Sequence, residues 1–153
     1  MLLISCLADC PQHLSTVASW IFDEWGHLIP GLSLNAVEDK LRTHLNRDTI
    51  PLTLVALSGD QPVGTASLML QDLSSRPDLF PWLASVFVVP GYRNQAIGSR
   101  LVTAIEDTGK ELHIAKVYLF TPDQEKFYSR LGWSVMDITE YRNQQVVIMY
   151  KSL

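Results

Sequence analysis

The chain has 153 residues, of which 47% are hydrophobic and 18% charged, and its formal net charge is −4 at pH 7. Because domains usually span about 100–200 residues, this length predicts a single domain over residues 1–153, and the composition excludes a disordered chain. The acidic balance, with no run rich in lysine or arginine, argues against nucleic acid as a partner.

The two cysteines, Cys6 and Cys10, form neither a disulfide framework nor a metal site, because a C-x3-C pair lacks a second pair of ligands. We therefore expect reduced thiols and no metal. No apolar run approaches the ~20 residues of a membrane helix, and the apolar start at residues 1–6 has no basic segment typical of a signal peptide. The sequence predicts a cytoplasmic protein with no membrane partner.

The first third of the chain predicts one strand followed by two helices. Residues 2–7 form a short apolar run typical of a strand. Apolar side chains over residues 14–25 recur at i, i+3, i+4 and i+7, which is the pattern of an amphipathic helix. Ser33 is the expected N-cap of a second helix, whose apolar stripe runs through residues 34–45.

The middle of the chain changes to the pattern of strands. Residues 52–57 and 63–70 predict a hairpin. The polar residues of 72–80 predict an exposed loop. A nearly continuous apolar run at 82–89 then predicts a third consecutive strand, so this part of the sheet is expected to be antiparallel.

The last third predicts alternating helices and strands and a closing hairpin. A helix is expected over residues 97–112, a strand over 116–120 and a short helix over 122–131. Strands at 133–138 and 146–150 close the chain. The whole order, β-α-α-β-β-β-α-β-α-β-β, predicts an α+β fold in which helices flank one central sheet as a three-layer sandwich.

The stretch from Val86 to Leu101 carries the clearest chemical signal. It runs from a strand through Pro90-Gly91 into the start of a helix built from small residues. Free N–H groups at a helix N-terminus attract an anion, and Arg93 adds a charged donor. A turn whose glycine only permits close packing is the alternative. The spacing excludes the Rossmann and P-loop motifs, which need more glycines or a Gly-Lys pair.

Two motifs together resemble the GNAT superfamily of N-acetyltransferases. Arg93-x-x-Ala96-x-Gly98 resembles the family's [RQ]-x-x-G-x-[GA] acetyl-CoA motif, and residues 125–133 resemble its "FY-x-x-x-GF" helix–strand junction. The separation of the motifs and the order of the elements also agree. One departure is Ala96, which stands where the motif has its first glycine, and we expect a small effect on cofactor affinity.

The resemblance implies a mixed, mostly antiparallel sheet whose fourth and fifth strands splay apart to admit acetyl-CoA. The backbone of Val86, Phe87 and Val88 would pair with the pantetheine arm, and one N–H there would polarise the thioester carbonyl. The pyrophosphate would lie on the amides of the following turn. The residues expected there are Arg93, Asn94, Gln95, Ala96, Ile97, Gly98 and Ser99.

The resemblance also assigns a catalytic acid and leaves the base open. Tyr128, by its position in the second motif, would donate a proton or a hydrogen bond to the departing thiolate of CoA. Many relatives carry a glutamate near the start of the fourth strand, where this chain has Trp82 and its neighbours. Asp72, with Asp78 as the second choice, is the expected base. A water chain, or an amine that binds already neutral, is equally allowed.

The expected reaction is direct attack of a primary amine of a small molecule on acetyl-CoA in a ternary complex. The alternatives are a peptide or protein N-terminus or lysine as acceptor, an inactive acyl-CoA sensor, and a nucleotide-binding protein unrelated to CoA. Glu24, Trp25 and His27 are expected near the acceptor, although Trp25 fits a core position better. His44 is expected on a polar position without a role. The edge of the closing hairpin offers a surface for a homodimer, although its apolar strands fit the core of a single chain equally well.

Overall fold

The computed structural model describes all residues from 1 to 153. Its elements follow the order predicted from the sequence, with four short 3-10 helices added. In chain order they are β1 (Leu2–Cys6), η1 (Leu7–Asp9), η2 (Pro11–His13), α1 (Leu14–Trp25), η3 (Gly26–Leu28), α2 (Leu34–Arg42), β2 (Leu52–Ser58), β3 (Gln61–Met69), β4 (Trp82–Val88), η4 (Pro90–Tyr92), α3 (Ile97–Glu111), β5 (Lys116–Thr121), α4 (Glu125–Arg130), β6 (Ser134–Tyr141) and β7 (Gln144–Ser152).

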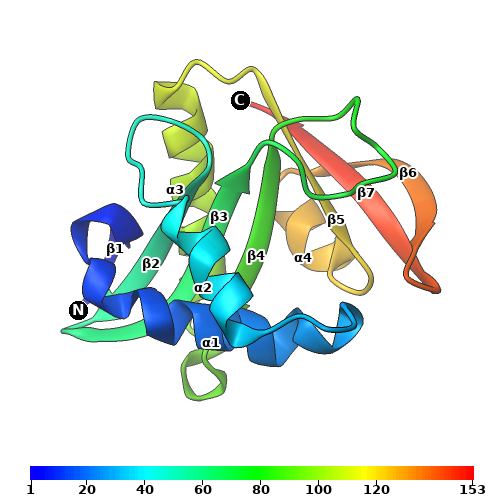
Figure 1. The fold of residues 1–153 in the computed structure, drawn as a ribbon. Coiled ribbons are helices and arrows are strands. Elements are labelled where there is room, and N and C mark those ends of the chain that lie inside the picture. Colours follow the sequence, from blue (N-terminus) through cyan, green and yellow to red (C-terminus); the bar gives the residue numbers. More distant parts are fainter.

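The strands form one seven-stranded sheet in the order β1-β2-β3-β4-β5-β7-β6. All neighbours are antiparallel except β4 and β5, which are parallel. Helices α1 and α2 lie on one face of the sheet, and α3 and α4 lie on the other (Figure 1). The α+β sandwich expected from the sequence is therefore confirmed.

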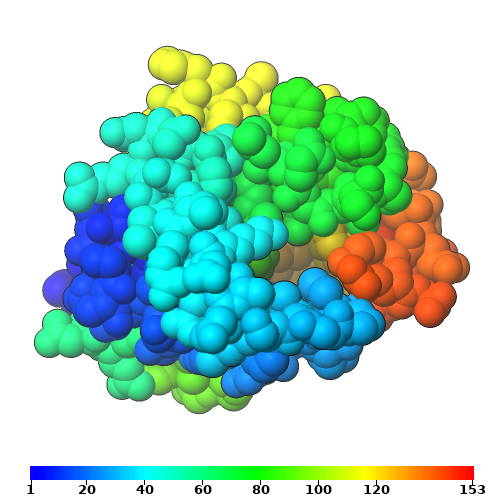
Figure 2. All heavy atoms as spheres, viewed as in Figure 1, coloured from blue at the N-terminus to red at the C-terminus, as the bar shows by residue number.

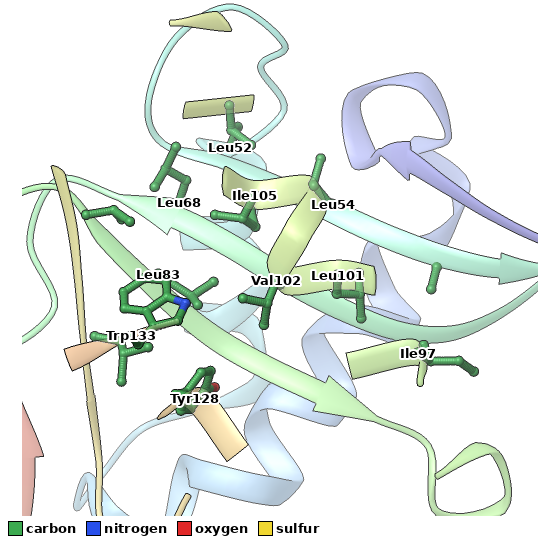
Figure 3. Close-up of a cluster of buried hydrophobic side chains, with 14 of the residues drawn as sticks. Leu52, Leu54, Leu68, Leu83, Ile97, Leu101, Val102, Ile105, Tyr128 and Trp133 are labelled. Carbon is green, nitrogen blue, oxygen red and sulfur yellow. The ribbon is translucent and has the colours of Figure 1, made fainter. Parts of the chain in front are cut away.

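Two apolar layers hold the helices to the sheet. On the face of α3 and α4, a cluster of 16 buried residues joins Leu101 and Ile105 of α3 to side chains of β2, β3 and β4 (Figure 3). On the other face, nine buried residues join α1 and α2 to Val55 and Leu57 of β2. The alternation along β2 explains this division, because successive side chains of a strand point to opposite faces.

The boundaries differ from the sequence prediction where side chains or turns decide them. Ser33 caps α2 as expected, since its Oγ accepts a hydrogen bond from the Ala36 amide at 3.1 Å. Helix α4 begins at Glu125 rather than at 122, because Thr121 Oγ1 accepts the Gln124 amide at 3.0 Å and holds a turn there. The closing hairpin turns on two residues with positive φ, Arg142 and Asn143, so both of its strands are longer than predicted.

The expectation of an exposed loop over residues 72–80 is wrong in part. Leu73 and Leu79 are buried, where they pack with Trp82 and Ile148. Arg76 also ties this loop to strand β6, since its guanidinium pairs with Asp137 at 3.1 Å. The loop is therefore anchored over the start of β4.

No helix of the structure is both long and apolar enough to cross a membrane.

Candidate active site

The turn between β4 and α3 presents free backbone amides. Ala96, with φ 62°, is the N-cap residue of α3 and offers no side-chain cap. The first main-chain bond of the helix runs from the Arg100 amide to the Ala96 carbonyl at 3.1 Å, which leaves the amides of Ile97, Gly98 and Ser99 without partners. At Gly98 a Cβ would lie 3.5 Å from the Phe127 ring, which is an ordinary contact, so the protein's own packing does not require glycine there. The geometry is that of an anion-binding helix N-terminus.

The left-handed conformation of Ala96 explains why the family motif has glycine there. Changing Ala96→Gly is expected to stabilise the protein by about 1 kcal/mol, because alanine is strained at positive φ. That gain corresponds to a rise in Tm of roughly 2–4 °C for a chain of this size. Ala104→Gly, within the regular part of α3, is the matched control and is expected to lower Tm. Thermal unfolding followed by circular dichroism measures both Tm values. A lower Tm for Ala96→Gly would contradict the claim that alanine is strained at this position.

A cavity of about 930 Å³ lies beside this turn and extends between β4 and β5. The two strands share only the pair Trp82 and Tyr118, so β4 beyond Trp82 has a free edge toward β5. The lining comes from β4, the turn and the start of α3, the end of β5 and the segment after it, α4, and the end of α1. It comprises Glu24, Trp25, Leu83, Ala84, Ser85, Val86, Phe87, Val88, Tyr92, Arg93, Asn94, Ala96, Ile97, Gly98, Ser99, Thr121, Pro122, Asp123, Gln124, Phe127 and Tyr128.

A bulge interrupts β4 within this lining. Its register against β3 shifts between the pairs Ser67–Ala84 and Thr65–Phe87, and Ser85 between them has φ 56°. A bulge redirects backbone groups out of the ladder. Strand β4 therefore offers an extended, unpaired edge with backbone N–H groups that can meet a ligand lying between the splayed strands.

Arg93 lies against β4 rather than over the free amides. Its Nε donates to the Val88 carbonyl at 2.9 Å, and its guanidinium lies 5.6 Å from the centre of the Phe87 ring. Of the ten residues expected to bind the cofactor, the structure places nine on the cavity and leaves Gln95 off it. Their roles stay predictions.

Tyr128 lies on the same cavity and is 8% exposed. Its ring packs edge to face with its neighbours, with its centre 5.0 Å from Phe127 and 6.1 Å from Trp133. Burial, with a further effect of the Asp123 carboxylate, raises the pKa of Tyr128 to about 12. The phenol is therefore protonated at any working pH, so it can donate a proton or a hydrogen bond but cannot serve as a base.

Asp72 lies in the loop after β3 and does not line the cavity. The residue keeps some exposure, yet burial of its carboxyl group raises the pKa of Asp72 to about 7, and Lys40 of α2 works against this rise. Lys40 belongs to α2, which covers one face of the sheet together with α1 (Figure 1). Figure 2 shows a hollow on that face, bordered by α2 and the segment before it, the loop of residues 70–81 and the β6–β7 hairpin.

The end of α1 brings an acidic and an aromatic side chain to the cavity. Glu24 is exposed and Trp25 half-buried, and both line it. The Phe87 ring lies between Trp20 and Trp25, with ring centres 5.6 and 6.5 Å away. The expectation that Trp25 belongs to the core is therefore wrong, because the splayed strands leave its ring facing open space. The cavity thus reaches both faces of the sheet.

The expectation for His44 is also wrong, because this side chain is 4% exposed. Its Nδ1 is 2.9 Å from Thr53 Oγ1, which is in turn 2.7 Å from Ser67 Oγ. Burial, together with Lys40, lowers the pKa of His44 to about 4. The ring is neutral and connects the end of α2 to the sheet.

Comparison with known proteins supports this picture. The sequence model of the Acetyltransferase (GNAT) family matches residues 14–133. Two solved aminoglycoside 6'-N-acetyltransferases are similar in structure, each with a TM-score of 0.76 over 98% of this chain and 96% of the other. One, crystallised with coenzyme A, is 16% identical, and the other, from Enterococcus faecium, is 17% identical. An acetyltransferase of the GNAT family from Streptococcus pneumoniae has a TM-score of 0.74 and 16% identity, covering 100% of this chain and 99% of its own. Among curated proteins, none matches the sequence.

The free amides at the start of α3, the splayed strands and the family match define an acyl-CoA-dependent transferase. The chain belongs to the GNAT acetyltransferase family. It is an N-acetyltransferase whose co-substrate is acetyl-CoA, as the two sequence motifs implied. The described residues contain no group of three or more His, Cys, Asp or Glu side chains placed to hold a metal ion.

Proposed function

We propose that the protein transfers the acetyl group of acetyl-CoA to a primary amine of a small cationic molecule, by direct attack in a ternary complex. The observation that carries this proposal is the cavity that passes Tyr128 and connects the free amides of α3 with Glu24 and Trp25. One end suits a phosphate and the other an ammonium group, which a carboxylate and an indole both attract. The names of the aminoglycoside-acetylating neighbours support the same class of acceptor.

The chain's residues divide the work of the reaction. The amides of Ile97, Gly98 and Ser99 bind the pyrophosphate, and the free edge of β4 pairs with the pantetheine arm. A backbone N–H near the bulge at Ser85 stabilises negative charge on the thioester oxygen. The amine adds to the thioester carbon, the carbon–sulfur bond breaks, and the thiolate leaves toward Tyr128.

The raised pKa of Tyr128 determines whether its hydroxyl transfers a proton to the thiolate or only donates a hydrogen bond to it. Full transfer of a proton from a phenol of pKa about 12 to a thiolate, whose thiol has a pKa near 8.5, is uphill by roughly 5 kcal/mol. A hydrogen bond from the hydroxyl to the developing thiolate has no such penalty. Tyr128 therefore stabilises the departing sulfur mainly as a hydrogen-bond donor.

Asp72 is the proposed base, and it receives the amine proton through water because it lies off the cavity. Its pKa of about 7 suits a group that must lose and regain a proton near neutral pH.

We also propose that the enzyme acts in the cytoplasm as a single domain. The exposed apolar residues Val135 and Ile138 on the edge strand β6 support the expected homodimer.

The test is release of CoA thiol from acetyl-CoA across a panel of small amines, peptides with free N-termini and lysine peptides. We expect turnover with a small diamine or aminoglycoside and none with a neutral alcohol of the same shape. Turnover with peptides alone would show that the acceptor is a peptide or protein amine and not a small molecule. Tight binding of acetyl-CoA in calorimetry, without turnover on any amine, would favour an acyl-CoA sensor.

A further inference from the structure

A buried carboxylate behind the active site has no part in the reaction described so far. Glu106 lies on the inner side of α3 and is 6% exposed, next to the apolar residues Val102 and Ile105. Its Oε1 accepts a hydrogen bond from Lys151 Nζ of β7 at 2.7 Å, and its Oε2 accepts one from Trp133 Nε1 at 3.2 Å. Both carboxylate oxygens are thus engaged by residues that are far away in the sequence.

The same lysine reaches the end of α4. Lys151 Nζ also donates to the carbonyl of Leu131 at 2.7 Å. The next residue, Gly132, has φ 93°, and a Cβ there would lie 3.4 Å from the lysine Nζ and Cε atoms. Glycine is therefore favoured by the left-handed turn, and the lysine ammonium lies in ordinary contact distance of it. Helix α3, strand β7 and the α4–β6 turn meet at this one ion pair.

The α4–β6 turn in turn holds Tyr128. The carbonyl of Tyr128 accepts hydrogen bonds from the amides of Leu131 and Trp133, at 3.0 and 3.1 Å. The Trp133 ring also packs on the Tyr128 ring, at 65° and 6.1 Å between centres. Figure 3 shows the two side chains together beside Leu83, at the edge of the cluster that α3 covers. Trp133 thus contacts both the backbone and the ring of Tyr128 while its indole nitrogen is fixed by Glu106.

Stability alone does not explain a charged pair at this place. Burying the Glu106 carboxylate, and part of the Lys151 side chain, offsets much of their attraction, and well-packed apolar side chains often serve a fold as well or better. What the pair adds is fixed geometry, because a carboxylate with two directed partners allows one orientation of each. The orientation that matters here is that of Trp133.

We propose that Glu106 is a positioning residue for the acetyl transfer. Acting through Trp133 and Lys151, it fixes the place of the Tyr128 hydroxyl in the cavity. It also ties that hydroxyl to α3, the helix whose first amides face the cofactor. This inference rests on the proposed role of Tyr128. A small misplacement of a catalytic group lowers rates strongly, so the loss is expected in kcat rather than in cofactor binding.

The experiment is a double-mutant cycle on kcat with Glu106→Gln and Tyr128→Phe. Glu106→Gln alone is expected to lower kcat about tenfold and to leave KM for acetyl-CoA within about twofold. In the Tyr128→Phe background the same change is expected to have no further effect, because the hydroxyl it positions is gone. Glu111→Gln, at the exposed end of the same helix, is the matched control and should leave kcat unchanged.

An equal fall in kcat in both backgrounds would overturn the inference, since a purely structural role acts without Tyr128. An unchanged kcat for Glu106→Gln, or a change confined to KM, would overturn it as well. If Tyr128→Phe itself has no effect, the proposed role of Tyr128 fails first and the inference falls with it. Should Glu106→Gln not fold, Trp133→Phe takes its place in the cycle. That variant keeps the ion pair, removes the indole N–H, and is expected to show the same dependence on Tyr128.

Discussion

Replacing Tyr128 by phenylalanine is expected to lower kcat by at least tenfold, and by up to about a hundredfold, with little change in KM for acetyl-CoA. The change removes one oxygen from a ring that is 8% exposed and packed between Phe127 and Trp133. The fold therefore has no reason to move, and the loss falls on the step in which the thiolate departs. Positioned proton donors typically contribute about 10²–10⁴ in rate, and a hydrogen bond without full transfer lies at the low end.

Steady-state thiol release with the best amine measures this effect, with Tyr150→Phe as the matched control. Tyr150 lies on β7, where Lys116 Nζ is 4.9 Å from the centre of its ring, and it does not line the cavity. Because the pKa of Tyr128 is about 12, no basic limb from this residue is expected below pH 10 in the wild type. A kcat equal to that of the control would remove Tyr128 from the mechanism.

The order of helices and strands could be predicted because it depends on local patterns. In α1 and α3 the apolar side chains repeat with the period of a helix, and Ser33 has its capping partner only three residues away. The free amides at the start of α3 could be predicted in the same way, because residues close together in the sequence define a helix N-terminus that follows a strand.

Features that depend on distant partners could not be predicted in this way. Leu73 and Leu79 lie in a polar stretch, and only the packing of Trp82 and Ile148 shows that they are buried. His44 is buried because Thr53 on β2 lies beneath it. Glu106 falls on the apolar stripe of α3, and its partner Lys151 is 45 residues away. A charged residue on a buried stripe was the one signal in the sequence that pointed to such a pair.

Changing Asp72→Asn is expected to remove the acidic limb of the pH profile. In the wild type, kcat/KM for the amine should rise through an apparent pKa near 7 as the Asp72 carboxyl group loses its proton and becomes a base. The asparagine variant should show no such rise, and at pH 8 its kcat/KM should be about a hundredfold lower. Asp78→Asn is the comparison, because Arg76 lowers the pKa of Asp78 and its carboxylate does not titrate near neutrality.

Although Asp72→Asn is expected to lose activity at pH 8, its stability at that pH is expected to rise. Burial raises the pKa of Asp72 in the folded state from 3.8 to about 7, so the folded protein binds this proton more tightly than the unfolded chain. The free energy of unfolding therefore falls as pH rises from about 4 to about 7, and the loss is complete above pH 7. Asp72→Asn removes this loss, so its Tm should exceed that of the wild type at pH 8 and match it near pH 3. If Asp72→Asn is more stable and less active than the wild type at pH 8, the ionised Asp72 carboxylate destabilises the fold but is needed for the reaction. This combination is expected of a buried general base. An acidic limb that survives in Asp72→Asn would instead assign the proton to water or to an amine that binds neutral.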